Sequence, residues 1–283
     1  MRPVFSRSIV RALLLAGTLA GASACASKGA EPPRIDLTQF DIVDLTHAYD
    51  AQTIYWPNAP SAFSVDTLAR GPVPGGWFYA ASRFASPEHG GTHLDAPIHF
   101  DAKGLSSDAI PPSQFLGPAV VIDISAQAAA NPDYRLTHDD VLRFERAHGP
   151  IGRGMMVLVR TGWSRRWPDR KAYLGDDRPG RTDALHFPSF GEDAAALLVQ
   201  SRQVAALGVD VASIDVGQST EFRVHRLAAA HNVLGLENLT NLEALPPTGA
   251  LLVALPMKIR GGTGGPLRAV ALVPRLPGAP TRQ

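Results

Sequence analysis

The sequence predicts a single α/β domain built around a substantial mixed sheet. Six short apolar runs rich in Val, Ile, Leu and Ala recur along the chain, mostly bounded by Gly, Pro or polar residues, as buried strands are. They lie at residues 40–45, 119–124, 155–160, 204–209, 251–255 and 269–273. Helical patterns occur between only some of these runs, and the chain contains no internal repeat. Strands mixed with a few helices are typical of an α/β or α+β domain.

The first predicted helix has a recognisable beginning and end. Thr137 followed by Asp140 resembles a capping box, with Asp in place of the usual Glu or Gln, and Gly149 and Pro150 end the helix. The other segments are located by pattern and composition: helices at 192–201 and 219–231, and loops rich in Gly, Pro or Asp at 71–76 and 175–182.

The N-terminal segment is expected to lie outside this domain. Residues 1–24 combine arginines, an apolar run too short to span a bilayer and a series of small residues, which is the pattern of an export signal. Residues 25–34 predict a tether, so the domain occupies residues 35–283. Cys25 stands where a bacterial lipoprotein signal places its acylated residue, and ordinary cleavage after an Ala-x-Ala triplet is the alternative. We therefore expect an exported, periplasmic protein, with a lipid anchor at Cys25 as one of two outcomes.

Composition excludes several classes of protein. Of the 283 residues, 45% are hydrophobic, which supplies an ordinary globular core and argues against a disordered chain. The formal net charge is +1, and removal of residues 1–24 takes away three Arg and no acid, which leaves −2. The basic residues are scattered, so no nucleic-acid surface is expected. With Cys25 as the single cysteine, the chain has no internal disulfide.

The segment at residues 89–99 is the strongest functional signal. It reads His89-Gly-Gly-Thr-His93-Leu-Asp95-Ala-Pro-Ile-His99. Imidazole nitrogens and a carboxylate suit a borderline divalent ion such as zinc or manganese, and no thiolate is available for a closed structural site. An ion here would be catalytic. Ordinary polar loop residues would be the better interpretation of one histidine, but that interpretation does not account for the whole cluster.

The Gly-Gly pair and the Pro within this segment indicate an extended or turning backbone instead of a helix. In an extended segment, residues two apart point the same way, so His93 and Asp95 can converge on one ion. The Gly-Gly pair would turn His89 back toward that ion. His99 would then arrive nearby, either as a general base or as a ligand of a second ion.

A second group of candidate ligands lies much later in the chain. His225 and His231 are six residues apart, which on a helix places them about 240° apart, so only one of them is expected to be a ligand. Glu237 is a lone acid within the apolar run 233–242, and a buried carboxylate needs a partner such as a cation. Without the first cluster, a Glu that accepts backbone hydrogen bonds at a strand end would be the commoner interpretation.

Residues 89–100 resemble the signature His-x-Gly-Thr-His-x-Asp-x-Pro-x-His-Phe of the metal-dependent cyclase family, which includes the bacterial kynurenine formamidases and isatin hydrolase. Residues 44–57, 208–215 and 255–268 resemble the opening, central and closing segments of the same family. The resemblance therefore extends across most of the chain beyond the tether. It implies a swivelling β/β/α single domain that assembles as a homodimer or homotetramer.

The resemblance also implies roles for individual residues. The implied metal ligands are His89, His93, Asp95, His225 and Glu237. Of these, the first three would hold one ion of zinc or manganese, and the last two would complete a second or shared site in which Asp95 bridges. One or two ions per subunit are thus expected. His99 matches the position of the general base or second-site ligand.

The expected reaction is hydrolysis of an N-formyl or cyclic amide on an aromatic acid or ketone by a metal-activated water, with His99 transferring the proton. Trp56, Trp77 and Phe78 are candidates for holding the planar ring of the substrate, and for Trp77 and Phe78 simple packing beside the metal loop is the alternative. Hydrolysis of a lactam or lactone, as in isatin hydrolase, and ligand binding without catalysis are the competing functions. Asp210 and Asp215 are expected to hold loops or histidines in place.

Overall fold

The computed structural model describes residues 36–275. The predicted export signal at 1–24 and the tether at 25–34, with Cys25, lie outside the described residues. By their internal contacts, the described residues from Leu37 onward belong to one unit. Among residues 36–275 there is no helix with the length and apolar character needed to cross a bilayer.

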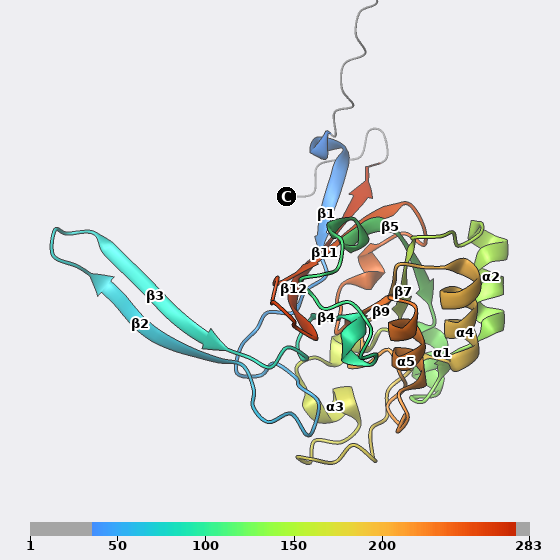
Figure 1. Cartoon of the computed structure of the whole chain (residues 1–283), viewed down its shortest axis with the longest axis horizontal. Helices are drawn as coiled ribbons and strands as arrows, with labels where there is room; N and C mark the ends of the chain where they lie inside the picture. Colours follow the sequence, from blue (N-terminus) through green and yellow to red (C-terminus); the bar gives the residue numbers. More distant parts are fainter. Residues whose placement is uncertain (1–35, 276–283) are drawn as a thin grey trace, which may run out of the picture. The chain divides into compact units, whose positions relative to one another are not determined.

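A mixed sheet of eight strands is the centre of this unit (Figure 1). Its strand order is β1, β12, β11, β5, β7, β9, β10 and β4, and β4 also pairs with β12, which closes the strands from β12 round to β4 into a barrel-like ring. The pairings among β5, β7, β9 and β10 are parallel and the others are antiparallel. The bounds are β1 (Phe40–Asp44), β4 (His93–Asp95), β5 (Leu116–Asp123), β7 (Met156–Arg160), β9 (Ala206–Val209), β10 (Leu234–Glu237), β11 (Ala250–Pro256) and β12 (Gly264–Pro274).

The predicted α/β domain with a substantial mixed sheet is confirmed, and each of the six apolar runs contributes a strand. Two further strands, β4 and β10, have three and four residues, which is too short for a periodic pattern to be visible in the sequence. These two short strands carry most of the predicted metal ligands. Their pairing therefore matters more for function than their length indicates.

The parallel strands β7, β9 and β10 are buried on both faces of the sheet. Along β7, Met156 and Leu158 belong to one hydrophobic core while Val157 and Val159 belong to the other, because successive side chains of a strand point to opposite faces. Helices α2 (His138–His148), α4 (Glu192–Ala196) and α5 (Arg223–Ala230) lie together on one side of the sheet (Figure 1). The other elements are α1 (Ser125–Ala130), α3 (Arg170–Leu174), the paired β6 (Arg135–Leu136) and β8 (Ser189–Phe190), a π-helical turn (Leu197–Arg202) and 3-10 turns at Leu37–Gln39, Pro97–His99, Pro112–Phe115, Trp163–Arg166 and Leu242–Ala244.

The helices agree with the sequence in position but not always in length. The second predicted helix is α4 continued by the π-helical turn. The third is shorter than predicted, because Phe222 adopts a left-handed conformation with φ +49° and α5 starts only after it. In α2 the predicted capping box is complete: Thr137 Oγ1 accepts from the Asp140 N–H at 3.1 Å, and the Asp140 carboxylate accepts from the Thr137 N–H at 2.9 Å.

This capping box gives a stability prediction. Thr137→Ala should lower the free energy of unfolding by about 1 kcal/mol, because the first turn of α2 loses its side-chain acceptor. Urea unfolding followed by circular dichroism measures this change. Thr67→Ala, at an exposed position of a strand, is the matched control and should have little effect. Equal stability of the two variants would contradict the assignment of the cap.

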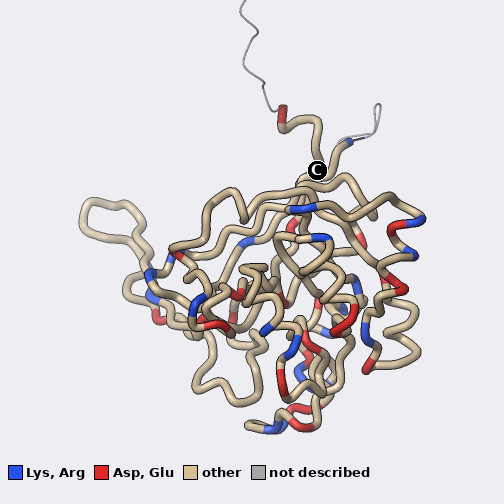
Figure 2. Tube along the Cα trace, turned by 45° about the vertical axis from the view of Figure 1, so that its right-hand side comes forward, with Lys and Arg blue, Asp and Glu red and all other residues tan. Residues whose placement is uncertain are grey.

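A separate hairpin of β2 (Ser64–Pro72) and β3 (Phe78–Ala85) extends away from the sheet (Figure 1). The sequence does not predict it, because both of its faces are largely exposed and its residues lack the alternation of a half-buried strand. Its outer part, residues 71–82, carries no charged side chain (Figure 2). The exposed large apolar side chains of the hairpin are Val65, Leu68, Trp77, Phe78, Tyr79 and Phe84.

Candidate active site

Strands β4 and β10 bring the two predicted groups of ligands together. They pair in antiparallel register, with Glu237 opposite His93 and Gly235 opposite Asp95. A Cβ on Gly235 would lie 3.0 Å from the Asp95 carboxylate, so the glycine leaves the space which that carboxylate needs. Within β4, His93 and Asp95 are two residues apart and point toward the same place, as the extended backbone predicts, with His93 Nε2 3.3 Å from Asp95 Oδ1.

The turn before β4 brings the first histidine back toward this pair. Gly90 and Gly91 have φ values of +143° and +58°, and tyrosine rings occupy the places where their Cβ atoms would be. Only glycine fits both requirements. The turn places His89 Nδ1 2.6 Å from Asp95 Oδ1, while His89 Nε2 contacts the Thr263 hydroxyl at 2.8 Å.

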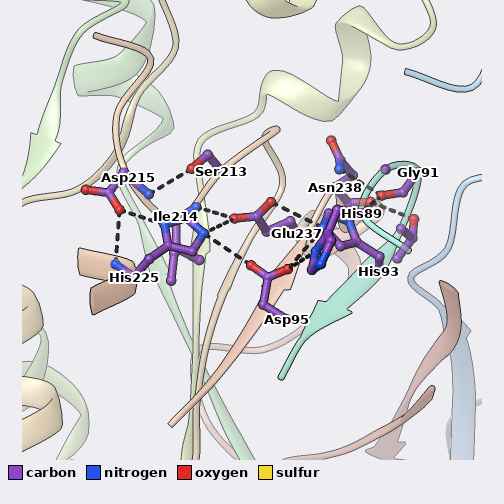
Figure 3. Close-up of polar contacts among 12 residues, drawn as sticks. His89, Gly91, His93, Asp95, Ser213, Ile214, Asp215, His225, Glu237 and Asn238 are labelled. Atoms are coloured by element: carbon purple, nitrogen blue, oxygen red, sulfur yellow. Dashed lines mark hydrogen bonds and ion pairs between the residues drawn. The ribbon is translucent and has the colours of Figure 1, made fainter. Parts of the chain in front are cut away.

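Asp95 lies at the centre of the cluster (Figure 3). Its Oδ1 contacts the first two histidines, and its Oδ2 lies 3.1 Å from His225 Nε2. Glu237 joins the same histidine through Oε1 at 3.0 Å and approaches His93 Nε2 through Oε2 at 3.5 Å. The five residues that the resemblance implies as metal ligands thus converge from three separate segments of the chain.

His225 is held in place by Asp215. Its Nδ1 lies 2.7 Å from Asp215 Oδ2, and the same carboxylate accepts from the backbone N–H groups of Val224 and His225 at the start of α5. This leaves Nε2 free to face the cluster. His231, just beyond the other end of α5, is exposed and its Nδ1 contacts the Leu227 carbonyl. The expectation that only one histidine of this pair faces the site agrees with this geometry.

His99 lies beside the cluster on the turn Pro97–His99. Its ring stacks on that of His89, with centroids 3.8 Å apart and planes inclined by 17°. Burial lowers the pKa of His99 to about 4, so its imidazole is neutral near pH 7 and offers a lone pair. The geometry is compatible with either role that the sequence left open, a base or a second-site ligand.

The donor atoms fit a divalent cation. His89, Asp95 and His99 form one group whose ligand atoms lie within 4.8 Å of one another, and a second such group shares Asp95 and adds His93 and Glu237. Among the described residues, the polar side chains in contact with these two carboxylates are histidines, with no Lys or Arg. Nitrogen and oxygen donors without thiolate suit zinc or manganese. The overlap of the groups at Asp95 accommodates one or two ions.

The electrostatics of the cluster favour positive charge at its centre. Burial by itself would lower the pKa of His225, but the carboxylates of Asp215, Asp95 and Glu237 outweigh it and hold the pKa well above the ordinary value. Burial would likewise raise the pKa of Asp95, yet its histidine partners hold it well below the usual range. Buried carboxylates that stay ionised need a compensating cation, and a divalent metal ion supplies one.

A cavity of about 400 Å³ opens onto the cluster. Its polar wall includes four of the histidines together with Asp95 and Glu237. Its apolar wall includes Trp56, Phe100 and Phe222, and the ring of Phe222 lies 6.1 Å from Trp56 and 5.4 Å from Phe100. Trp56, a candidate for substrate binding from the sequence, lines this cavity, and the two phenylalanines were not singled out from the sequence as substrate-binding residues.

Trp77 and Phe78 do not line this cavity. They lie at the turn of the β2–β3 hairpin and are 59% and 64% exposed. They are close to the metal motif in sequence, but the hairpin carries the chain away from the sheet before β3 returns to it. Packing beside the metal loop, the alternative for these two side chains, does not occur either.

Besides these two phenylalanines, Thr263 and Asn238 were not identified from the sequence as residues of the site. Thr263, from the segment before β12, contacts His89, and Asn238 directly follows Glu237 and also lines the cavity. The family resemblance of residues 255–268 could have indicated Thr263, which lies within that closing segment. For Asn238 the sequence offers only its position next to a ligand.

Comparison with known proteins identifies the family. Residues 43–216 match the Cyclase family, described as "Putative cyclase". An isatin hydrolase from Roseibium aggregatum is 38% identical over 208 residues, which cover 71% of this chain and 77% of that protein. A kynurenine formamidase from Salinibacter ruber is 29% identical over 81% of this chain and 96% of its own length.

Solved structures agree with this result. Isatin hydrolase A from Ralstonia solanacearum has a TM-score of 0.75 and 37% identity and covers 83% of this chain and 93% of its own. The crystal structure of an isatin hydrolase bound to the product analogue thioisatinate has a TM-score of 0.77 and 34% identity, with 84% and 94% covered. The chain therefore belongs to the cyclase family and is an enzyme of the metal-dependent hydrolase class.

Proposed function

We propose that this protein hydrolyses an amide bond, either an N-formyl amide or a cyclic amide, in a small aromatic substrate. The observation that carries the proposal is the cavity, in which a wall of imidazoles and carboxylates faces a wall of aromatic rings. Aromatic rings favour a planar apolar substrate, and the polar wall provides ligands for a divalent cation and a group that moves protons.

His89, His93, Asp95, His225 and Glu237 would hold zinc or manganese, as one or two ions. Such an ion supplies Lewis acidity, which polarises a carbonyl group and lowers the pKa of a coordinated water to about 7. Asp95 contributes to both groups of ligand atoms, and Asp215 holds His225 with Nε2 toward the centre.

The protein's own side chains orient the substrate and move the proton. Trp56 and Phe222 line the same cavity as the ligand cluster and confine a planar ring beside it. Attack of water on the carbonyl carbon forms a carbon–oxygen bond, the carbon–nitrogen bond then breaks, and one proton of the water has to reach the departing nitrogen. His99, whose neutral ring lies at the edge of the cluster, accepts this proton and returns it to the departing nitrogen.

Hydrolysis of a cyclic amide, as in isatin, has specific support. The isatin hydrolase from Roseibium aggregatum is 38% identical to this chain, compared with 29% for the kynurenine formamidase from Salinibacter ruber. A lactone of similar shape is the related alternative. Both kinds of substrate present a carbonyl beside an aromatic ring, so the same residues serve either reaction.

A two-substrate assay tests this proposal. The purified protein loaded with zinc or manganese should hydrolyse isatin or N-formylkynurenine, followed by the absorbance of the product. Removal of the ion with a chelator should abolish turnover, and addition of the ion should restore it. Stoichiometric metal binding without turnover of either compound would contradict the proposed substrate class, and absence of metal binding would contradict the mechanism.

We also propose that the protein forms a homodimer or homotetramer through the β2–β3 hairpin. A two-stranded hairpin is marginally stable in water, and this one exposes several large apolar side chains that a second copy would cover. Trp77 and Phe78 could then contribute to substrate binding only from a neighbouring subunit. Light scattering on the purified protein tests the assembly, and a monomer at micromolar concentration would contradict it.

For location, we propose export to the periplasm, with Cys25 as a site of lipid attachment. The proposal rests on the arginines, apolar run and small residues of positions 1–24. Fractionation of cells that express the full chain, with Cys25→Ala as the comparison, distinguishes the outcomes. A protein found only in the cytoplasm would contradict export, and membrane association unchanged by Cys25→Ala would contradict lipidation.

A further inference from the structure

Asn238 occupies a demanding position beside the ligand cluster. It directly follows Glu237 at the end of β10, is 2% exposed and has a φ of +53°. Asn tolerates this left-handed conformation better than most residues do. Its backbone is fully used, because the N–H donates to the Val211 carbonyl at 2.8 Å and the carbonyl accepts from Thr92 Oγ1 at 2.6 Å.

The side-chain amide of Asn238 connects two distant parts of the chain, and Figure 3 shows it close to Gly91. Its Nδ2 donates to the Gly91 carbonyl at 2.7 Å, and its Oδ1 accepts from the Tyr173 hydroxyl at 2.9 Å. Since a carbonyl only accepts, the contact with Gly91 defines which end of the amide is the NH₂ group. Burial raises the pKa of Tyr173 well above its ordinary value, so the hydroxyl keeps its proton and donates it.

The Gly91 carbonyl links Asn238 to a predicted metal ligand. It also accepts from His93 Nδ1, at 3.0 Å, so two donors meet on one oxygen. His93 Nδ1 therefore carries the hydrogen, and Nε2 is the nitrogen that faces Asp95 and Glu237. The orientation of the His93 ring thus depends on where the Gly91 carbonyl is held.

We propose that Asn238 is a positioning residue, which holds the Gly91 carbonyl and through it orients His93 for metal binding. The proposal rests on the metal-dependent function proposed above and assigns a role to a residue outside the ligand set. Metal-binding histidines are commonly oriented by a partner on the second ring nitrogen, and here that partner needs its own support.

This position requires a residue that tolerates a positive φ, donates to the Gly91 carbonyl and accepts from the Tyr173 hydroxyl. Asn meets all three requirements, and other residues meet them only in part. Gly would accept the left-handed backbone but has no amide. Asp would place a carboxylate oxygen against the Gly91 carbonyl, so that two acceptors would face each other. Larger amides and apolar residues disfavour the positive φ.

Zinc affinity is the measurement that tests this role. Asn238→Gly and Asn238→Asp, made in the full chain, should bind zinc about tenfold or more weakly than wild type in competition with a chromophoric chelator. Nitrogen-15 spectra of the histidine rings in the zinc-loaded proteins should show a changed His93 signal. Asn241→Gly is the matched control: its φ is +56°, and its Nδ2 also donates to a backbone carbonyl, that of Asp44, but it does not line the cavity.

The possible outcomes separate this proposal from the proposed function. Wild-type zinc affinity in both Asn238 variants, with an unchanged His93 signal, would overturn the positioning role. Failure of the wild-type protein to bind zinc or manganese would overturn the proposed metal-dependent function, and this inference with it. If the Asn238 variants do not fold, Tyr173→Phe removes only the hydroxyl that orients the amide, and unchanged zinc affinity in that variant would also overturn the proposal.

Discussion

Asp95→Asn should abolish both metal binding and hydrolysis. The carboxylate contacts three histidines and belongs to both groups of ligand atoms, so its loss removes a donor from every arrangement of ions that the site accommodates. Asparagine has nearly the same shape but lacks the negative charge. We expect zinc affinity to fall by more than about 100-fold, because even residues that only support a ligand commonly contribute 10-fold to 100-fold.

Asp95→Asn should lower the rate of hydrolysis even more than it lowers zinc affinity. Lewis-acid assistance is worth several kcal/mol, and each 1.4 kcal/mol is a factor of ten, so kcat/KM should fall by about 10³-fold or more. Asp123→Asn, at an exposed carboxylate paired with Arg160 at the end of β5, is the matched control and should retain activity. A variant of Asp95 that keeps its zinc and loses less than tenfold in rate would show that this carboxylate is not the shared ligand.

His99→Ala should separate catalysis from metal binding. If His99 transfers the proton between water and the leaving nitrogen, kcat should fall by about 10² to 10⁴-fold, while zinc content and affinity remain close to those of wild type. The prediction depends on His99 lying beside the cluster, where its ring stacks on that of His89. Metal analysis and single-turnover kinetics on the same sample measure both quantities.

The alternative role of His99 gives the opposite result. A second-site ligand would take one ion with it when it is removed, and the bound zinc would fall from two ions to one. His231→Ala, an exposed histidine just beyond the end of α5, is the control and should change neither quantity. Full activity of the His99 variant would exclude both roles.

The fold was predictable where its signals are local. The continuous apolar runs of β5 and β7 predict strands, because most of their side chains are buried on both faces of the sheet. The start of α2 was predictable because Thr137 and Asp140, three residues apart, cap it through a local contact. The hairpin of β2 and β3 was not predictable in this way. Its exposed faces impose no alternation of polar and apolar residues, so the pattern that identifies other strands is missing.

For the site, too, the sequence predicted what depends on local residues and missed what depends on distant contacts. By itself, the sequence determined the chemistry: nitrogen and oxygen donors around a Gly-Gly turn, with Asp95 among them, predict a divalent ion and hydrolysis. The tertiary structure decided which residues meet. The register that sets Glu237 opposite His93, the Asp215 contact that turns His225 toward Asp95, and the exposure of Trp77 all depend on contacts between segments far apart in the chain. Residue type determines what a side chain can bind. Strand pairing and core packing determine where that side chain lies, and a local sequence pattern does not predict this position.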